Sequence, residues 1–195
     1  MEKLTGLKKI KTAVFISGTG SNLRNIIKFS TIKKSPISID LIISNTNKAK
    51  GLRFANQFKV KKKIFNFKNI ENIENIEKNI LLLLKKEKIK FICLAGFMKI
   101  LSKGFIKKFE GKIINIHPSL LPKYKGLNTH SRAINNKDKF AGCTVHYVTA
   151  KLDSGKTILQ KKIKIAAREN PASLAKKVLK QEHKLYLAAI MKIFN

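Results

Sequence analysis

The sequence predicts a single α/β domain built on a doubly wound, mostly parallel, Rossmann-like sheet, with an antiparallel strand in its C-terminal part. Short continuous apolar runs, typical of strands buried on both faces, alternate with stretches of helical spacing. This alternation over the first five strands is the pattern of a doubly wound sheet. With 195 residues and 44% hydrophobic side chains, the chain is long enough to bury one sizeable core.

The expected elements follow in order along the chain. Buried strands are predicted at 13–16, 37–44, 63–67, 91–95 and 112–116, and a late pair of strands, with the antiparallel one near Val145, at 142–148 and 157–165. Helices are predicted from Leu23, at 49–58, from Ile70 to about Lys88, at 102–109 with Ser102 as N-cap, at 130–136, and from Pro171 onward. The first strand should be central, with its glycine loop opening toward the same edge of the sheet as Asn115 and His117.

A glycine-containing loop follows the first strand. Gly18-Thr19-Gly20-Ser21-Asn22 leads directly into a helix, and this arrangement presents free N–H groups and a positive dipole end to an anion. Leu23 occupies the place of the third glycine of a dinucleotide fingerprint, so the loop does not indicate an NAD site. The alternative interpretation is a simple chain reversal.

Two polar side chains end the fifth strand. Asn115 and His117 are two residues apart, which on an extended chain places them on one face, and Pro118 then takes the backbone out of the sheet. The carboxyl ends of such strands are where open α/β folds bind ligands. The alternative is a histidine that only caps a strand end; the neighbouring amide and the proline-bounded loop favour a site.

The net charge of +31 raises the question of nucleic-acid binding. However, only four of the 42 basic residues are Arg, the preferred reader of phosphates and bases, and the lysines run along the whole chain. Lys, Ile and Asn supply 81 residues, a bias of A/T-rich codons that needs no function. We therefore expect no specific nucleic-acid partner.

Other compositional signals are weak. No apolar run is long enough to cross a bilayer, and the N-terminus lacks a signal core, so we expect a cytoplasmic protein without a membrane partner. Cys93 and Cys143 lie in apolar runs and are expected to be buried thiols. The histidines and Asp153 show no ligand spacing, so no metal is expected. The oligomeric state stays open.

Four motifs together resemble one family. They are Ser-Gly-x-Gly-Ser-Asn-Leu at 17–23, Ala-Gly-Phe-Met-basic-Ile-Leu at 95–101, Asn-x-His-x-Ser-Leu-Leu-Pro at 115–122, and Thr-Val-His-Tyr-Val-Thr followed by Leu-Asp-x-Gly at 144–155. In order and spacing they are similar to the folate-dependent formyltransferases, and most of all to the phosphoribosylglycinamide formyltransferases of purine synthesis. The resemblance implies that residues 1–195 are a formyltransferase domain using 10-formyltetrahydrofolate as co-substrate.

The resemblance also implies roles for individual residues. Asn115, His117 and Asp153 would be catalytic, with His146 a structural histidine. The phosphoribosylglycinamide site would comprise Gly20, Ser21, Asn22, Gln181 and Glu182. The folate site would comprise Met98, Lys99, Ile100, Leu101, Asn115, Thr149, Ala150, Lys151, Leu152 and Asp153.

The sequence departs from the family in three places. Lys125 and Asn128 stand where proline and histidine are common, and no arginine matches the one that helps bind folate near the start of the helix after Phe67. Asp153 also has a simpler interpretation, as a carboxylate that hydrogen-bonds its own turn.

The trio suits formyl transfer to an amine. Asn115 can donate to the developing oxyanion, His117 can carry a proton near neutral pH, and Asp153 would raise the pKa of that histidine. Two alternatives remain. One is a methionyl-tRNA formyltransferase-like enzyme, although we expect the C-terminal RNA-binding domain usual there to be absent after Asn195. The other is a non-enzymatic nucleic-acid binder, which only the charge favours.

Overall fold

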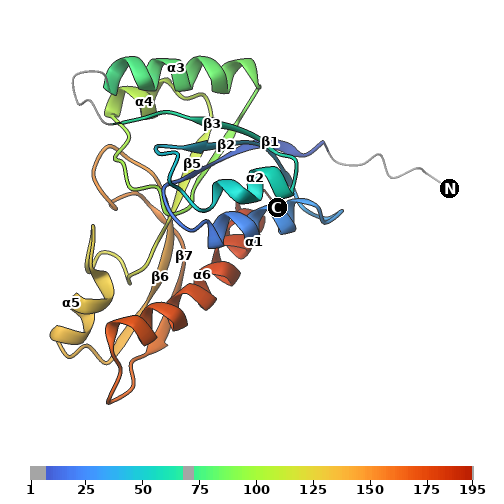
Figure 1. Cartoon of the computed structure of the whole chain (residues 1–195). Helices are drawn as coiled ribbons and strands as arrows, with labels where there is room; N and C mark the ends of the chain where they lie inside the picture. The colour runs from blue at the N-terminus through green and yellow to red at the C-terminus, as the bar shows by residue number, and fades with distance from the viewer. Residues whose placement is uncertain (1–7, 68–72, 195) are drawn as a thin grey trace.

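In the computed structural model, which describes residues 8–67 and 73–194, the strands form one sheet in the order β3-β2-β1-β4-β5-β6-β7 (Figure 1). The strand bounds are β1 (Ile10–Ile16), β2 (Ile37–Ser44), β3 (Lys61–Ile64), β4 (Phe91–Leu94), β5 (Lys112–His117), β6 (Phe140–Tyr147) and β7 (Thr157–Lys164). Strands β1 to β5 pair in parallel, while β6 runs antiparallel to both β5 and β7. The predicted fold class is confirmed, including the interior place of β1 and the antiparallel strand around Val145.

Helices cover the sheet on both faces. Their bounds are α1 (Ser21–Ser30), α2 (Leu52–Gln57), α3 (Ile73–Lys86), α4 (Lys103–Lys108), α5 (Thr129–Asn135) and α6 (Pro171–Phe194). Apolar side chains of α1, α2 and α6 pack into one core with one set of strand residues, and those of α3 and α4 pack into a second core with the alternate set (Figure 1). Burial of both faces explains why the central strands read as continuous apolar runs rather than alternating ones.

The third strand begins two residues and ends three residues earlier than predicted. The sequence favoured 63–67 because its apolar residues begin at Ile64, but β3 is Lys61–Ile64 and all four of its side chains are exposed. Phe67 is buried, yet it reaches the core after the strand has ended. An exposed, lysine-rich strand at the edge of a sheet resists pairing with other chains, and its composition hides it from a search for buried strands.

The helices lie where they are expected: α2 and α4 are shorter than predicted, α1 begins two residues earlier, and α5 is shifted by one residue. Helix α3 begins at Ile73 in the described residues, and Ile70, the predicted start of its apolar stripe, lies outside them. Helix α4 begins after Ser102, whose hydroxyl accepts a hydrogen bond from the Phe105 N–H at 3.0 Å, as an N-cap does. Both cysteines are buried and free, as predicted.

Candidate active site

The loop after β1 and the end of β5 lie at the same edge of the sheet. Because β1, β4 and β5 are parallel, their carboxyl ends meet there, and this places Gly20 and His117 on the same side of the molecule. Ile113, Ile114 and Ile116 fix β5 in the core, and Pro118 ends the strand directly after His117. The sheet edge predicted for the site is therefore the one observed.

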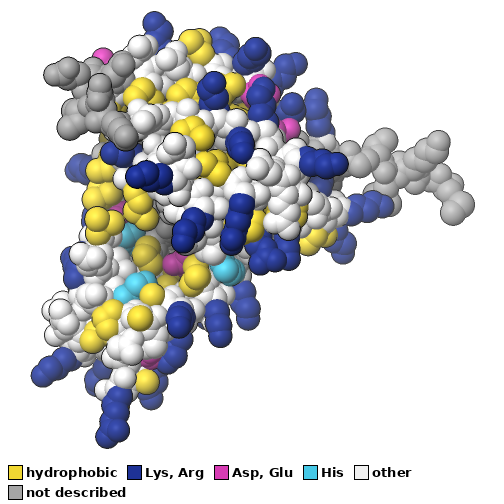
Figure 2. Space-filling view, viewed as in Figure 1, with side chains coloured by type: hydrophobic (Ala, Val, Ile, Leu, Met, Phe, Trp, Pro, Cys, Tyr) yellow, Lys and Arg dark blue, Asp and Glu magenta, His cyan; other side chains and the backbone are white. Residues whose placement is uncertain are grey.

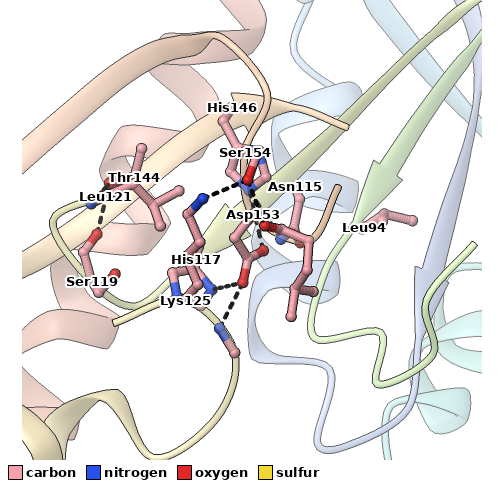
Figure 3. Close-up of polar contacts among 12 residues, drawn as sticks. Leu94, Asn115, His117, Ser119, Leu121, Lys125, Thr144, His146, Asp153 and Ser154 are labelled. Carbon is pink, nitrogen blue, oxygen red and sulfur yellow. Dashed lines mark hydrogen bonds and ion pairs between the residues drawn. The ribbon is translucent and has the colours of Figure 1, made fainter. Parts of the chain in front are cut away.

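The three predicted catalytic residues converge there (Figure 3). Asp153, from the loop after β6, places Oδ2 3.3 Å from His117 Nδ1, and both side chains are more than nine-tenths buried. The same carboxylate oxygen accepts the Gly126 N–H at 2.9 Å. The other ring nitrogen, Nε2, lies 2.8 Å from the Tyr124 carbonyl oxygen. His117 is thus held between two oxygens that can only accept hydrogen bonds.

His146 is part of the same cluster, which the sequence did not predict. Its Cα lies opposite that of Asn115 in the β5–β6 pair. Its Nδ1 faces the Tyr147 carbonyl oxygen at 2.9 Å, so in a neutral ring that nitrogen carries the proton and Nε2 is an acceptor. Nε2 lies 3.3 Å from Asn115 Nδ2 and 3.6 Å from Asp153 Oδ1. One N–H of Asn115 therefore points at His146, which orients the amide.

Burial and charge act in opposite directions on the pKa of His117. Burial lowers this pKa below its usual value of 6.5, and it outweighs the Tyr124 carbonyl and the Asp153 carboxylate, which both raise it. The direction expected for Asp153 is right, but the net shift is downward. For Asp153, burial alone would raise the pKa; the contact with His146, the hydrogen bond from the Gly126 N–H and the nearby His117 bring it below its usual value of 3.8. The carboxylate is therefore ionised at neutral pH.

The cluster lines a cavity of about 1000 Å³. Asn115, His117, His146 and Asp153 form part of its wall. Figure 2 shows histidine and acidic side chains in a hollow that hydrophobic and basic side chains surround. A cavity of this volume is the size of a site for a drug-sized ligand.

Most residues assigned to the folate line this cavity. Met98, Lys99, Ile100 and Leu101 contribute one wall, and Thr149, Lys151 and Leu152 contribute another, whereas Ala150 does not line it. Met98 and Ile100 are 64% and 67% exposed, a large apolar surface that faces open space. Lys125 and Asn128, the departures from the family pattern, lie in the loop between β5 and α5, where Asn128 lines the cavity.

Only two of the five residues assigned to the phosphoribosyl substrate line this cavity. Asn22 and Glu182 line the cavity, and Asn22 Nδ2 donates to Glu182 Oε2 at 2.8 Å. Burial raises the pKa of Glu182, and the Asn22 hydrogen bond partly offsets this. Gly20 is the left-handed N-cap of α1 and Ser21 its first residue. Neither these two nor Gln181 line the cavity in the described residues.

Two groups that hold the site in place could not be predicted from the sequence. The Tyr124 carbonyl oxygen leaves no sequence signal because any residue has one. Tyr186, on α6 one turn beyond Glu182, donates its buried hydroxyl to the Leu94 carbonyl oxygen at 2.8 Å. A tyrosine at a helical core spacing can be recognised, but its partner 92 residues away cannot.

The described residues do not suggest other classes of site. They contain no group of three or more His, Cys, Asp or Glu side chains that could hold a metal ion. No helix among them is long and apolar enough to cross a membrane. A sheet-edge cavity lined by an amide, an imidazole and a carboxylate is instead typical of an α/β enzyme that acts on a small molecule.

Comparisons with known proteins agree. The family model described as Formyl transferase matches residues 10–190. The chain is 41% identical to phosphoribosylglycinamide formyltransferase of Haemophilus influenzae over 90% of this chain and 83% of that protein. It is 40% identical, over 94% of its length, to the human trifunctional purine biosynthetic protein adenosine-3, of which it spans 18%. The crystal structure of phosphoribosylglycinamide formyltransferase from Brucella melitensis has a TM-score of 0.90 at 40% identity, covering 95% of this chain and 96% of that one. The chain belongs to the formyl transferase family.

Proposed function

We propose that this chain transfers the formyl group of 10-formyltetrahydrofolate to the amine of 5-phosphoribosylglycinamide, a step of purine synthesis. The observation that carries the proposal is the convergence of Asn115, His117 and Asp153 on a cavity that Asn22 and Glu182 also line. The named relatives of similar length support the same substrates. We also propose that the whole of residues 1–195 is one formyltransferase domain, acting on small molecules in the cytoplasm.

The reaction we infer is direct. The amine lone pair attacks the formyl carbon, and the C=O π electrons move to the oxygen. Asn115 donates its second N–H to this oxyanion, and His117, once it has taken the proton of the attacking amine, supports it as an imidazolium. Collapse breaks the bond between the formyl carbon and the folate nitrogen; the amine loses a proton and the folate nitrogen gains one. Asp153 keeps His117 able to carry charge.

The two subsites follow from the same surfaces. We assign the apolar wall at Met98 and Ile100, with the facing loop 149–153, to the folate. We assign the loop Gly20–Asn22 to the phosphate, because the N-terminus of α1 offers N–H groups there, and the carboxylate of Glu182, with Gln181 beside it, to the glycinamide side.

The test is a side-by-side acceptor assay. Purified protein with 10-formyltetrahydrofolate should release tetrahydrofolate, followed by absorbance, when phosphoribosylglycinamide is present and not when methionyl-tRNA replaces it. Turnover with methionyl-tRNA instead would select the rival formyltransferase. Binding of neither small substrate, together with tight salt-sensitive nucleic-acid binding, would favour the non-enzymatic alternative.

A further inference from the structure

The wall segment 96–101 has little support of its own. It joins β4 to α4, and its side chains Met98 and Ile100 project into the cavity rather than into the core. A wall made of exposed apolar side chains presents a defined shape only if its backbone is held from behind.

The first end of the segment is held by Ser17, at the end of β1. The Ser17 N–H donates to the Gly96 carbonyl oxygen at 3.0 Å, and the Ser17 hydroxyl accepts the Met98 N–H at 2.7 Å. Between them, the ring of Phe97 packs edge-on against Phe15 and Phe67, at centroid distances of 5.4 Å and 6.0 Å.

The second end is held by a buried carboxylate outside the cavity. Glu77, on α3, is 3% exposed. One of its oxygens accepts the Ser102 N–H at 2.8 Å, and the other accepts the Ser102 hydroxyl. Ser102 directly follows the wall segment and caps α4. Since burying a carboxylate is costly unless donors compensate it, both contacts matter for holding Glu77 where it is.

We propose that Glu77 is a positioning residue for the folate subsite: by fixing Ser102 it sets the position of the wall segment 96–101. The inference rests on the proposed function, since it assumes that folate binds against this wall. Glu77 does not line the cavity and does not contact the catalytic trio. It therefore acts on folate binding only by holding the backbone of the wall segment. If releasing Ser102 leaves about a tenth of the molecules with a competent wall, the folate dissociation constant rises about tenfold.

The experiment compares Glu77→Gln and Glu77→Ala with Glu74→Gln, a matched change on the same helix at an exposed carboxylate. Measured are the Kd for a tetrahydrofolate analogue by fluorescence, KM for each substrate, and kcat. Glu77→Ala is expected to raise the folate Kd and KM about tenfold, with KM for phosphoribosylglycinamide and kcat within about twofold of the unmodified chain. Glu77→Gln keeps one acceptor oxygen, so its folate Kd should lie between those of the unmodified chain and Glu77→Ala. Glu74→Gln should change none of these constants.

Unchanged folate affinity in a folded Glu77→Ala protein would overturn the inference, as would an equal loss of affinity for both substrates. If Glu77→Ala does not fold, Ser102→Ala decides, because it removes the hydroxyl contact and leaves the carboxylate in place. A several-fold rise in folate KM alone supports the proposal, and a normal folate KM refutes it. An unmodified chain that binds no folate would instead refute the proposed function.

Discussion

At the scale of residues, the site is a balance between burial and local charge around one imidazole. Both nitrogens of His117 face oxygens that only accept, the Tyr124 carbonyl and the Asp153 carboxylate, and this arrangement favours the imidazolium. Burial favours the neutral ring and prevails, so the pKa of His117 lies below 6.5. The Tyr124 carbonyl and the charge on Asp153 together limit this fall in the pKa.

Replacing Asp153 with Asn tests this balance. The pKa of His117 should fall further, and kcat should drop roughly 10²-fold, the lower end for losing an acid–base group, with small changes in KM. Asp153 has a φ of +45°, a region that Asn tolerates, so the backbone should keep its course. The measurements are the pH–rate profile and substrate affinity, with Asp40→Asn as a control away from the cavity. Near-normal turnover with an unshifted profile would reduce Asp153 to a turn residue.

The residues of the site were unequally predictable. Asn115 and His117 could be paired from sequence because their spacing of two on a strand fixes a common face. His146 could not be joined to them, because its contact depends on the antiparallel register that places it opposite Asn115, and the sequence does not determine register. The net direction of the His117 pKa was missed for a similar reason: Asp153 was visible in the sequence, but the extent of burial was not.

At the scale of elements, a close approach of two loops shapes the turn after β1. A Cβ on Gly20 would lie 2.6 Å from the Cα of Gly51, and Gly20 has a φ of +76°. A Cβ on Gly18 would meet nothing within 4 Å, and Gly18 has no positive φ.

Gly20→Ala should therefore displace the turn and weaken phosphoribosylglycinamide binding about tenfold or more, while folate binding changes little. The left-handed backbone alone costs a residue with a side chain roughly 1–2 kcal/mol. Gly18→Ala is the matched control and should leave the thermal stability of the protein unchanged. The readout is the Kd for each substrate by calorimetry. Equal Kd values for phosphoribosylglycinamide in the two variants would show that binding does not depend on glycine at position 20.

One buried hydroxyl of helix α6 hydrogen-bonds two strands of the sheet. Tyr186, fully buried, reaches the carbonyl oxygens of Leu94 on β4 and Ile114 on β5, and Glu182 lies one turn earlier on the same helix. Tyr186→Phe keeps the ring and removes only this donor, so the free energy of unfolding should fall by about 1–3 kcal/mol. Urea unfolding measures it. A change below about 0.5 kcal/mol would show that the hydroxyl does not hold the helix.

The elements themselves were mostly predictable. Continuous apolar runs located the strands that are buried on both faces, and the glycine loop, Ser102 and Pro171 located the starts of α1, α4 and α6. The predicted position of β3 was too late in the chain because its exposed lysines give no apolar pattern. The contacts that join distant elements, such as Tyr186 to Leu94 and Glu77 to Ser102, follow from packing and leave no local pattern.

At the scale of the whole molecule, one buried and two partly buried histidines should make the fold sensitive to mild acid. Burial lowers the pKa values of His117, His130 and His183 below 6.5. The unfolded chain then binds these protons more readily, so stability is present above about pH 6.5 and is lost as pH falls below it. Glu182, with a raised pKa, acts in the opposite direction but is one group.

We therefore expect the thermal midpoint to fall between about pH 7.5 and 5.5. The net charge of +31 adds self-repulsion, which salt screens, whereas the cost of charging a buried histidine is screened much less. Scans by calorimetry at low and high salt separate the two: added salt should raise the midpoint at every pH and leave the slope with pH in place. A midpoint that does not fall toward pH 5.5 would contradict the expectation that burial lowers the pKa values of these three histidines in the folded chain.

The most direct measurement follows the formyl group itself. 10-Formyltetrahydrofolate labelled with ¹³C in the formyl carbon is incubated with phosphoribosylglycinamide and the purified chain, and the label is located by NMR. The proposed mechanism predicts that the label appears as a formamide on the glycinamide nitrogen, and that His117→Ala and Asn115→Ala slow its appearance by about 10²-fold or more. Label that remains on the folate, or that appears as free formate, would contradict it.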